Sequence, residues 1–176
     1  MIFQKGVLSM SDVLLRPATL SDAEGIGRVH CLAWRETYTG LLPDAMMTRL
    51  SVERSTAIFR REGCRNMLVA LRNDEIVGFC GYGAWRGESA VPNLGEIVGL
   101  YVLQKAQGQG IGTLLMQAAL EALREKGCSQ AALWVLDSNT HAIAYYARRG
   151  FQDTGLTQGS GPVLERQMLC SLVASH

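Results

Sequence analysis

A glycine-rich turn at residues 107–112 leads directly into the most regular amphipathic helix of the chain. Apolar side chains then recur at intervals of three and four, the spacing that places them on one helical face: Ile111, Leu114, Leu115, Ala118, Ala119, Ala122 and Leu123. Lys126 and Gly127 follow, a basic last turn and a glycine, which is typical of a helix C-terminus. The sequence therefore predicts a helix over 110–126 with one face to bury.

The rest of the chain supplies the strands and helices that such a helix needs as packing partners. Runs of apolar and β-branched residues bounded by turn residues predict strands at 13–16, 67–71, 76–84, 96–102, 131–136, 151–157 and 163–170. Ser21 and Glu24 have the spacing of a capping box and predict the start of another helix. Further helices are expected at 52–61 and 140–149. This order predicts a mixed α/β sheet within one domain.

Length and charge limit the class of protein. A chain of 176 residues fits one domain, which we expect to span 12–172, with residues 1–11 as a flexible extension. Residues 1–9 lack the apolar core of a signal peptide. The net charge of +1 provides no overall field for nucleic acid or anionic lipid, and no apolar run reaches membrane-spanning length.

The cysteines and histidines indicate neither disulfides nor a metal site. Five cysteines are widely separated and form no C-x-x-C pair, which is typical of reduced thiols in the cytoplasm. Three histidines without ligand spacing do not predict a zinc site. We therefore expect a cytoplasmic protein without a bound metal.

The turn at 107–112 has the features of a phosphate-binding loop. Glycines allow a sharp turn and a close approach of a ligand to the backbone. The first amides of a helix have no internal partner and carry positive potential, which suits a pyrophosphate. A Walker loop would require a lysine directly before Thr113. A Rossmann fingerprint that began at Gly108 would require a glycine at position 113, where this chain has threonine. Both alternatives are excluded.

Two motifs resemble the GNAT superfamily of N-acetyltransferases. The first is Leu100-Tyr101-Val102 followed by Gln107-x-x-Gly110-x-Gly112. The second is Asn139-x-x-Ala142-x-x-Tyr145-Tyr146 followed by Gly150-Phe151. The resemblance covers nearly the whole chain. It implies a single-domain α/β fold with a mixed, mostly antiparallel sheet flanked by helices and a parallel central strand pair.

The resemblance also implies acetyl-coenzyme A as the acyl donor. Its pyrophosphate would be held at the loop and the first helical turn by Gln107, Gly108, Gln109, Gly110, Ile111, Gly112 and Thr113. The backbone of Leu100, Tyr101 and Val102 would pair with the pantetheine arm, and Asn139 would bond the same arm while capping the third helix. The family often has arginine at the position of Gln107, so here the backbone and nearby Lys105 are left to offset the phosphates.

Transfer to an amine requires proton movements. An alkylammonium has a pKa of about 10.4, so the enzyme must remove a proton, stabilise an oxyanion and protonate the departing thiolate. By resemblance Tyr146 is the candidate acid, whereas its neighbour Tyr145 is expected in the core. Glu96 is the candidate base, directly or through water, because Trp134 stands where some relatives carry a glutamate.

The acceptor is not named by any residue. The segment after the first helix borders the acceptor groove in this fold, so Trp34, Tyr38 and Trp85 are candidate substrate-binding residues, and ordinary packing explains them equally well. The leading hypothesis is an acetyltransferase for a primary amine of a small molecule or peptide. A protein N-terminal or lysine acetyltransferase and a non-catalytic acyl-CoA-binding regulatory domain are the alternatives. Many relatives are homodimers, although no residue here indicates assembly.

Overall fold

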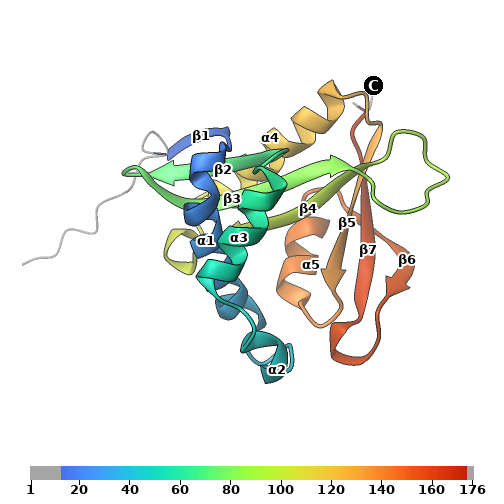
Figure 1. The fold of residues 1–176 in the computed structure, drawn as a ribbon. Coiled ribbons are helices and arrows are strands. Elements are labelled where there is room, and N and C mark those ends of the chain that lie inside the picture. The colour runs from blue at the N-terminus through green and yellow to red at the C-terminus, as the bar shows by residue number, and fades with distance from the viewer. Residues whose placement is uncertain (1–12, 174–176) are drawn as a thin grey trace, which may run out of the picture.

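Seven strands form one sheet in the computed structural model, which describes residues 13–173 (Figure 1). The strands are β1 (Val13–Pro17), β2 (Met67–Arg72), β3 (Glu75–Ala84), β4 (Gly95–Val102), β5 (Gln130–Leu136), β6 (Gln152–Gln158) and β7 (Glu165–Ser171). Their order is β1-β2-β3-β4-β5-β7-β6, and neighbours are antiparallel except β4 and β5, which are parallel. The expected fold class is confirmed.

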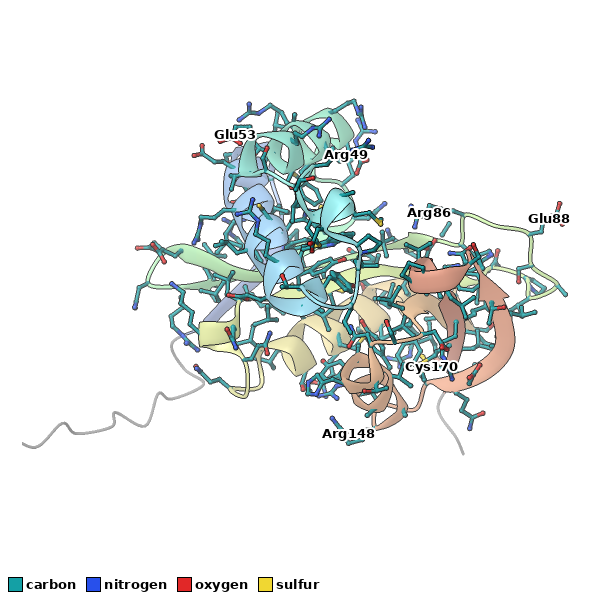
Figure 2. All side chains as sticks on the ribbon, turned by 90° about the horizontal axis from the view of Figure 1, so that it is seen from below. Arg49, Glu53, Arg86, Glu88, Arg148 and Cys170 are labelled. Atoms are coloured by element: carbon teal, nitrogen blue, oxygen red, sulfur yellow. The ribbon has the colours of Figure 1, made fainter. Side chains whose placement is uncertain are left out.

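Helices cover both faces of this sheet. They are α1 (Ala23–Tyr38), α2 (Asp44–Met47), α3 (Val52–Glu62), α4 (Ile111–Glu125) and α5 (Thr140–Ala147), with short 3₁₀ turns at Leu20–Asp22, Gln104–Ala106 and Gly161–Val163. Helices α1 and α3 lie on one face, whereas α4 and α5 lie on the other (Figure 1). Figure 2 accordingly shows Glu53 of α3 and Arg148 at the end of α5 on opposite sides of the sheet.

The apolar stripe of α4 forms the larger core, as its spacing predicts. Ile111, Leu115, Met116, Ala119 and Leu123 are buried against the sheet. A second core lies under α1, where Ala23, Ile26 and Val29 pack against Phe79 of β3. The two cores fix one helix layer on each face, so the sheet between them has a defined position.

The central parallel pair is short. Strands β4 and β5 are in register only at Gly95 with Ala131 and at Glu96 with Ala132, and then they diverge. Strand β4 continues to pair with β3 as far as Val102, while β5 pairs with β7 along its whole length. The facing edges of β4 and β5 therefore leave an opening in the middle of the sheet.

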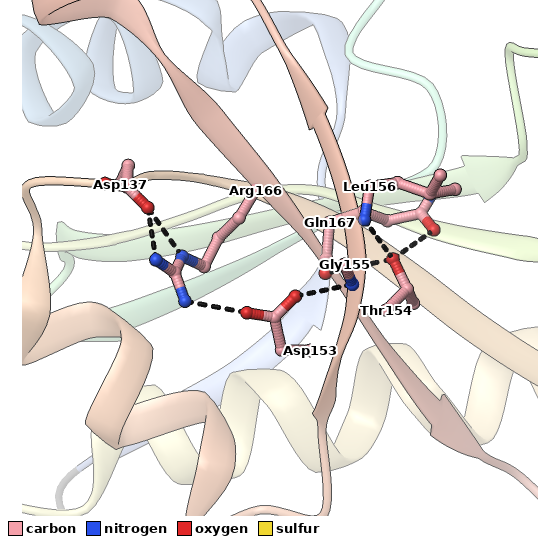
Figure 3. A network of polar contacts seen from close by, with 7 residues as sticks. All are labelled: Asp137, Asp153, Thr154, Gly155, Leu156, Arg166 and Gln167. Atoms are coloured by element: carbon pink, nitrogen blue, oxygen red, sulfur yellow. Dashed lines mark hydrogen bonds and ion pairs between the residues drawn. The ribbon is translucent and has the colours of Figure 1, made fainter.

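A polar network joins β7 to β6 and to the residue that follows β5 (Figure 3). Arg166 of β7 donates a hydrogen bond to Asp137, which follows β5, at 2.8 Å, and another to Asp153 of β6 at 2.7 Å. The hydroxyl of Thr154 donates to the Gln167 side chain at 3.0 Å. Both carboxylates draw Arg166 to one side of β7, so its neighbour Glu165 points to the opposite face.

The structure differs from the sequence-based expectations at two places on the α1 side. The capping box begins at Thr19, whose backbone N–H donates to the Asp22 carboxylate at 2.7 Å, and it does not begin at Ser21. Helix α2 was not expected, because its four residues bury no side chain and carry no periodic pattern. The expected extension at 1–11 lies outside the described residues. Within 13–173, no helix has the length and apolar character needed to cross a bilayer.

Candidate active site

A cavity of about 820 Å³ occupies the opening between β4 and β5. Its walls come from both faces of the sheet. On the face of α4 and α5 it is lined by residues of the glycine-rich loop and by Asn139, Tyr145, Tyr146 and Arg149. On the opposite face it is lined by Trp34, Thr37, Tyr38, Leu42 and Met46, together with Trp134, Val163 and Glu165. The cavity therefore passes through the sheet, and a ligand on each face can reach the middle.

The glycine-rich loop opens α4 at one entrance of this cleft. Gly108 has a φ of 70° and Gly110 a φ of 81°, a left-handed backbone that favours glycine. Gly110 is the N-cap of α4 and has no side chain to satisfy the first helical amides. These unpaired N–H groups and the helix dipole favour an anion at this entrance.

The side chain of Gln107 has a role that the sequence did not predict. Its Nε2 donates to the carbonyl of Val102 at 2.9 Å, which fastens the loop to the end of β4. The N–H of Leu103 donates to Val77 in β3 at 2.9 Å. Because hydrogen-bonding groups alternate along an antiparallel strand, the N–H and C=O of Leu100 and Val102 face the cleft, whereas those of Tyr101 face β3.

Two polar groups beside the loop test whether the site fits a diphosphate. The hydroxyl of Tyr145 and the Nε of Arg149 are buried and have no hydrogen-bond partner among residues 13–173. The guanidinium lies 3.4 Å from the Tyr145 ring centroid, and its Nη2 donates to Thr113 at 2.5 Å. A Cβ on Gly112 would lie 3.2 Å from the Tyr145 hydroxyl. Two unused donors thus converge on the first turn of α4, where an anion fits.

Neither Tyr145 nor Arg149 was assigned to the site from the sequence. Tyr145 was expected in the core, and it does pack against the core through its ring while its hydroxyl reaches the loop. Arg149 lies 36 residues after Thr113 in the chain, and no spacing pattern marks the pair. The position of Arg149, a basic residue just after α5, was the sequence feature that could have indicated an anion-binding role.

Tyr146 lines the same cleft. Its ring lies 5.4 Å from that of Tyr145 and 5.8 Å from that of Phe151. Burial raises the pKa of its hydroxyl, so Tyr146 stays protonated, as a proton donor requires. The Asn139 side chain accepts from the Ala142 backbone at 3.1 Å, which caps α5 and positions both tyrosines.

Glu96, the predicted base, is absent from the walls of the cavity. Its carboxylate accepts from Nη2 of Arg86 at 2.7 Å and from Nε of Arg86 at 3.0 Å. It lies at the last paired position before β4 and β5 diverge. Arg86 begins the long loop that carries Glu88 outward in Figure 2. Glu96 therefore lies beside the cavity-lining residue Ile97 and is tied to that loop through Arg86, and its role as a base stays a prediction.

Aromatic side chains surround the entrance on the α1 side. Trp34 Nε1 donates to the Tyr101 hydroxyl at 3.0 Å, and the rings of Trp34 and Tyr38 meet edge to face at 4.7 Å. Burial is the main cause that raises the pKa of Tyr38, and the charges of neighbouring groups, Glu165 among them, add to it. Trp85 is not part of the wall, because it contacts the cleft only through Trp134, with ring centroids 6.0 Å apart.

Comparison with known proteins identifies this arrangement. The model of the acetyltransferase (GNAT) family matches residues 28–151. An uncharacterized N-acetyltransferase of Archaeoglobus fulgidus is 31% identical over 76% of this chain and 88% of its own. The uncharacterized N-acetyltransferase YuaI of Bacillus subtilis is 29% identical over 77% and 78%. A PaiA N-acetyltransferase from Thermoplasma acidophilum, solved in complex with coenzyme A, superposes with a TM-score of 0.74 at 19% identity, covering 90% and 98%.

The family match covers most of the chain, and it agrees with a sheet that opens beside a glycine-rich loop. This chain therefore belongs to the acetyltransferase (GNAT) family and is an N-acetyltransferase.

Proposed function

We propose that this chain transfers an acetyl group from acetyl-coenzyme A directly to a primary amine of a small molecule or peptide. One observation carries the proposal, the cleft through the sheet with an anion-binding loop at one entrance and an aromatic wall at the other. An extended donor lying between β4 and β5 would present its thioester in the middle of the sheet. An amine that enters from the α1 side would meet it there.

The donor would be held by groups that lack partners in the protein. We assign its pyrophosphate to the amides that open α4, with Arg149 and the Tyr145 hydroxyl as additional donors. The N–H and C=O of Leu100 and the N–H of Val102 would pair with the amides of the pantetheine arm, as a neighbouring strand would.

The acceptor ammonium would lose one proton to solvent before its nitrogen attacks. Tyr146 would supply the proton that the sulfur takes up as it leaves, and the second proton released by the nitrogen would return Tyr146 to its protonated form. Bound acetyl-coenzyme A supplies a thioester carbonyl that an amine can attack. Of the two N–H groups of Leu100 and Val102 that point into the cleft, the one beside the thioester would stabilise the negative charge that develops on its carbonyl oxygen, and the other would stay paired with the pantetheine arm. Among residues 13–173 no cysteine lines the cavity, and burial raises the pKa of Cys80 to about 12, which favours direct attack over a covalent enzyme intermediate.

An acceptor screen that follows the release of free coenzyme A tests this function. Purified enzyme with acetyl-coenzyme A should release thiol when one class of primary amine is added. Acetylation of peptides alone would favour the protein acetyltransferase alternative. Coenzyme binding by calorimetry without thiol release across a wide amine panel would favour a regulatory domain and reject an enzyme.

Two further assignments are proposals that need their own measurements. We infer a cytoplasmic location, supported by five cysteines that are all free thiols. Assembly into a homodimer is testable by light scattering of the purified chain.

A further inference from the structure

The α1-side entrance of the cleft has an unusual charge distribution. Of the described residues that line the cavity, Glu165 is the one carboxylate and Arg149 the one arginine or lysine. Arg149 lies at the opposite entrance, where it bonds Thr113 and the carbonyl of Tyr145. Positive charge therefore marks the loop entrance, whereas negative charge marks the entrance assigned to the acceptor.

The charge of Glu165 is not neutralised by the rest of the described protein. Its Oε2 accepts a hydrogen bond from the neutral amide of Gln158 at 2.7 Å, and its Oε1 has no hydrogen-bond partner within residues 13–173. The adjacent Arg166 is engaged by Asp137 and Asp153 on the other side of β7 (Figure 3). A carboxylate in a cleft with no cation beside it attracts a positively charged ligand.

The surroundings of Glu165 are also those that a cation prefers. Tyr38, Tyr101 and Glu165 line the same cavity. Burial chiefly raises the pKa of the Tyr38 hydroxyl, and the nearby charge of Glu165 adds to this effect. Together with Trp34 the two tyrosine rings form an aromatic wall at the entrance. Aromatic faces attract an ammonium group and also accommodate an apolar body.

We propose that Glu165 binds the ammonium group of the acceptor and that the acceptor carries no carboxylate next to its reacting nitrogen. This inference deepens the proposed function and rests on it. The physical reason is that a carboxylate beside the amine would lie near Glu165, with no described cation at that entrance to offset the repulsion. Like charges placed side by side in an interface are strongly unfavourable. Amines without an adjacent carboxylate, such as aralkylamines, alkylamines and amidated amino acids, are accordingly the acceptor class, and acetylation at the α-nitrogen of a free amino acid is excluded.

Three matched acceptors test whether a carboxylate next to the reacting nitrogen lowers the activity. We compare 2-phenylethylamine, phenylalanine and phenylalaninamide at saturating acetyl-coenzyme A and measure kcat/KM from thiol release. The amine should exceed the amino acid by about tenfold or more, because the added carboxylate faces Glu165. The amide should recover most of the activity, since it has the substituent without the charge. An amide rejected as strongly as the acid would indicate steric exclusion and overturn the inference.

The variant Glu165→Gln tests the residue. It should raise the KM for 2-phenylethylamine about tenfold, the effect of losing a hydrogen bond to a charged group. It should also lower the ratio of kcat/KM for 2-phenylethylamine to kcat/KM for phenylalanine, while the KM for acetyl-coenzyme A stays the same. Glu165→Asp should restore part of the preference, because it retains the charge. The matched control is Glu62→Gln, an exposed glutamate of α3 that is absent from the cavity wall.

The outcomes separate the two proposals. Thiol release with equal kcat/KM for amine and amino acid, or an unchanged preference in folded Glu165→Gln, would overturn the role of Glu165 and leave the acetyltransferase function intact. No thiol release with any amine would reject the proposed function, and the assignment of Glu165 would fail with it.

Discussion

Tyr146 and Tyr145 are adjacent residues to which we assign different roles, proton donation and coenzyme binding. We expect Tyr146→Phe to lower kcat about a hundredfold, the scale of a lost general acid, while the Kd for acetyl-coenzyme A is kept. Because burial raises the pKa of Tyr146 above its usual value of 10, the wild-type rate should show no loss from its ionisation below pH 10. The matched variant Tyr145→Phe should instead weaken coenzyme binding. Steady-state kinetics and calorimetry distinguish them, and a full kcat in Tyr146→Phe would remove it from the chemistry.

A variant of Glu96 tests whether this buried carboxylate near the cleft stabilises the fold or acts in catalysis. The side chain is 4% exposed and is held by Arg86, which is 69% exposed. We expect Glu96→Gln to lower the free energy of unfolding by about 1–3 kcal/mol, because it weakens hydrogen bonds to a charged partner. The shape of the pH–rate profile should not change. If the acidic limb of the profile disappears in this variant, Glu96 is the base, because a general base must be deprotonated to act.

At the scale of the element, the loop before α4 can be tested against the other end of the same helix. Gly108 and Gly127 have φ values of 70° and 83°, and a Cβ at either would meet no atom within 4 Å. Alanine at each should therefore cost about 1 kcal/mol of backbone strain. Only Gly108→Ala should also raise the Kd for acetyl-coenzyme A, because it alters the anion-binding turn. Equal affinities in the two variants, measured by calorimetry, would contradict a role for this loop.

Elements with a strong local pattern could be predicted, and those without one could not. Helix α4 followed from apolar residues at intervals of three and four and from Gly127 after its last turn. Helix α2 was not predicted, because its four residues include no buried side chain and carry no periodicity. The capping box was misplaced by two residues, because Thr19 and Ser21 are equally suitable hydroxyls. It belongs to the 3₁₀ turn that precedes α1, and only the bond from the Thr19 N–H to the Asp22 carboxylate decides between the two positions.

At the scale of the whole molecule, the cleft is a property of strand pairing and has no local signature. The resemblance implied a parallel central pair, but no residue pattern shows that β4 and β5 part after Glu96 and Ala132. For the same reason Glu165 escaped the sequence analysis, since it reaches the wall of the cavity only through the pairing of β7 with β5. The glycine-rich turn before α4 could be predicted because its glycines and the following helix are contiguous, and its role in binding phosphate stays a prediction.

The opening in the sheet makes a prediction about stability. A ligand that bridges the unpaired edges of β4 and β5 binds only the folded chain, so it shifts the unfolding equilibrium by mass action. Acetyl-coenzyme A at a hundred times its Kd should add about 2.7 kcal/mol, which for a chain of this length raises Tm by roughly 5–10 °C. Thermal unfolding followed by circular dichroism measures the shift.

Hydrogen exchange locates this effect within the sheet. Amides of Leu100 and Val102 should exchange more slowly with the ligand bound, because they face the cleft and gain an acceptor there. Phe79 of β3 pairs with Tyr101. The exchange rate of its amide should change less on ligand binding, since the β3–β4 ladder is already complete without ligand. A Tm that rises without slower exchange at Leu100 and Val102 would show that the coenzyme binds elsewhere, and the strand-like pairing of donor and β4 would be wrong.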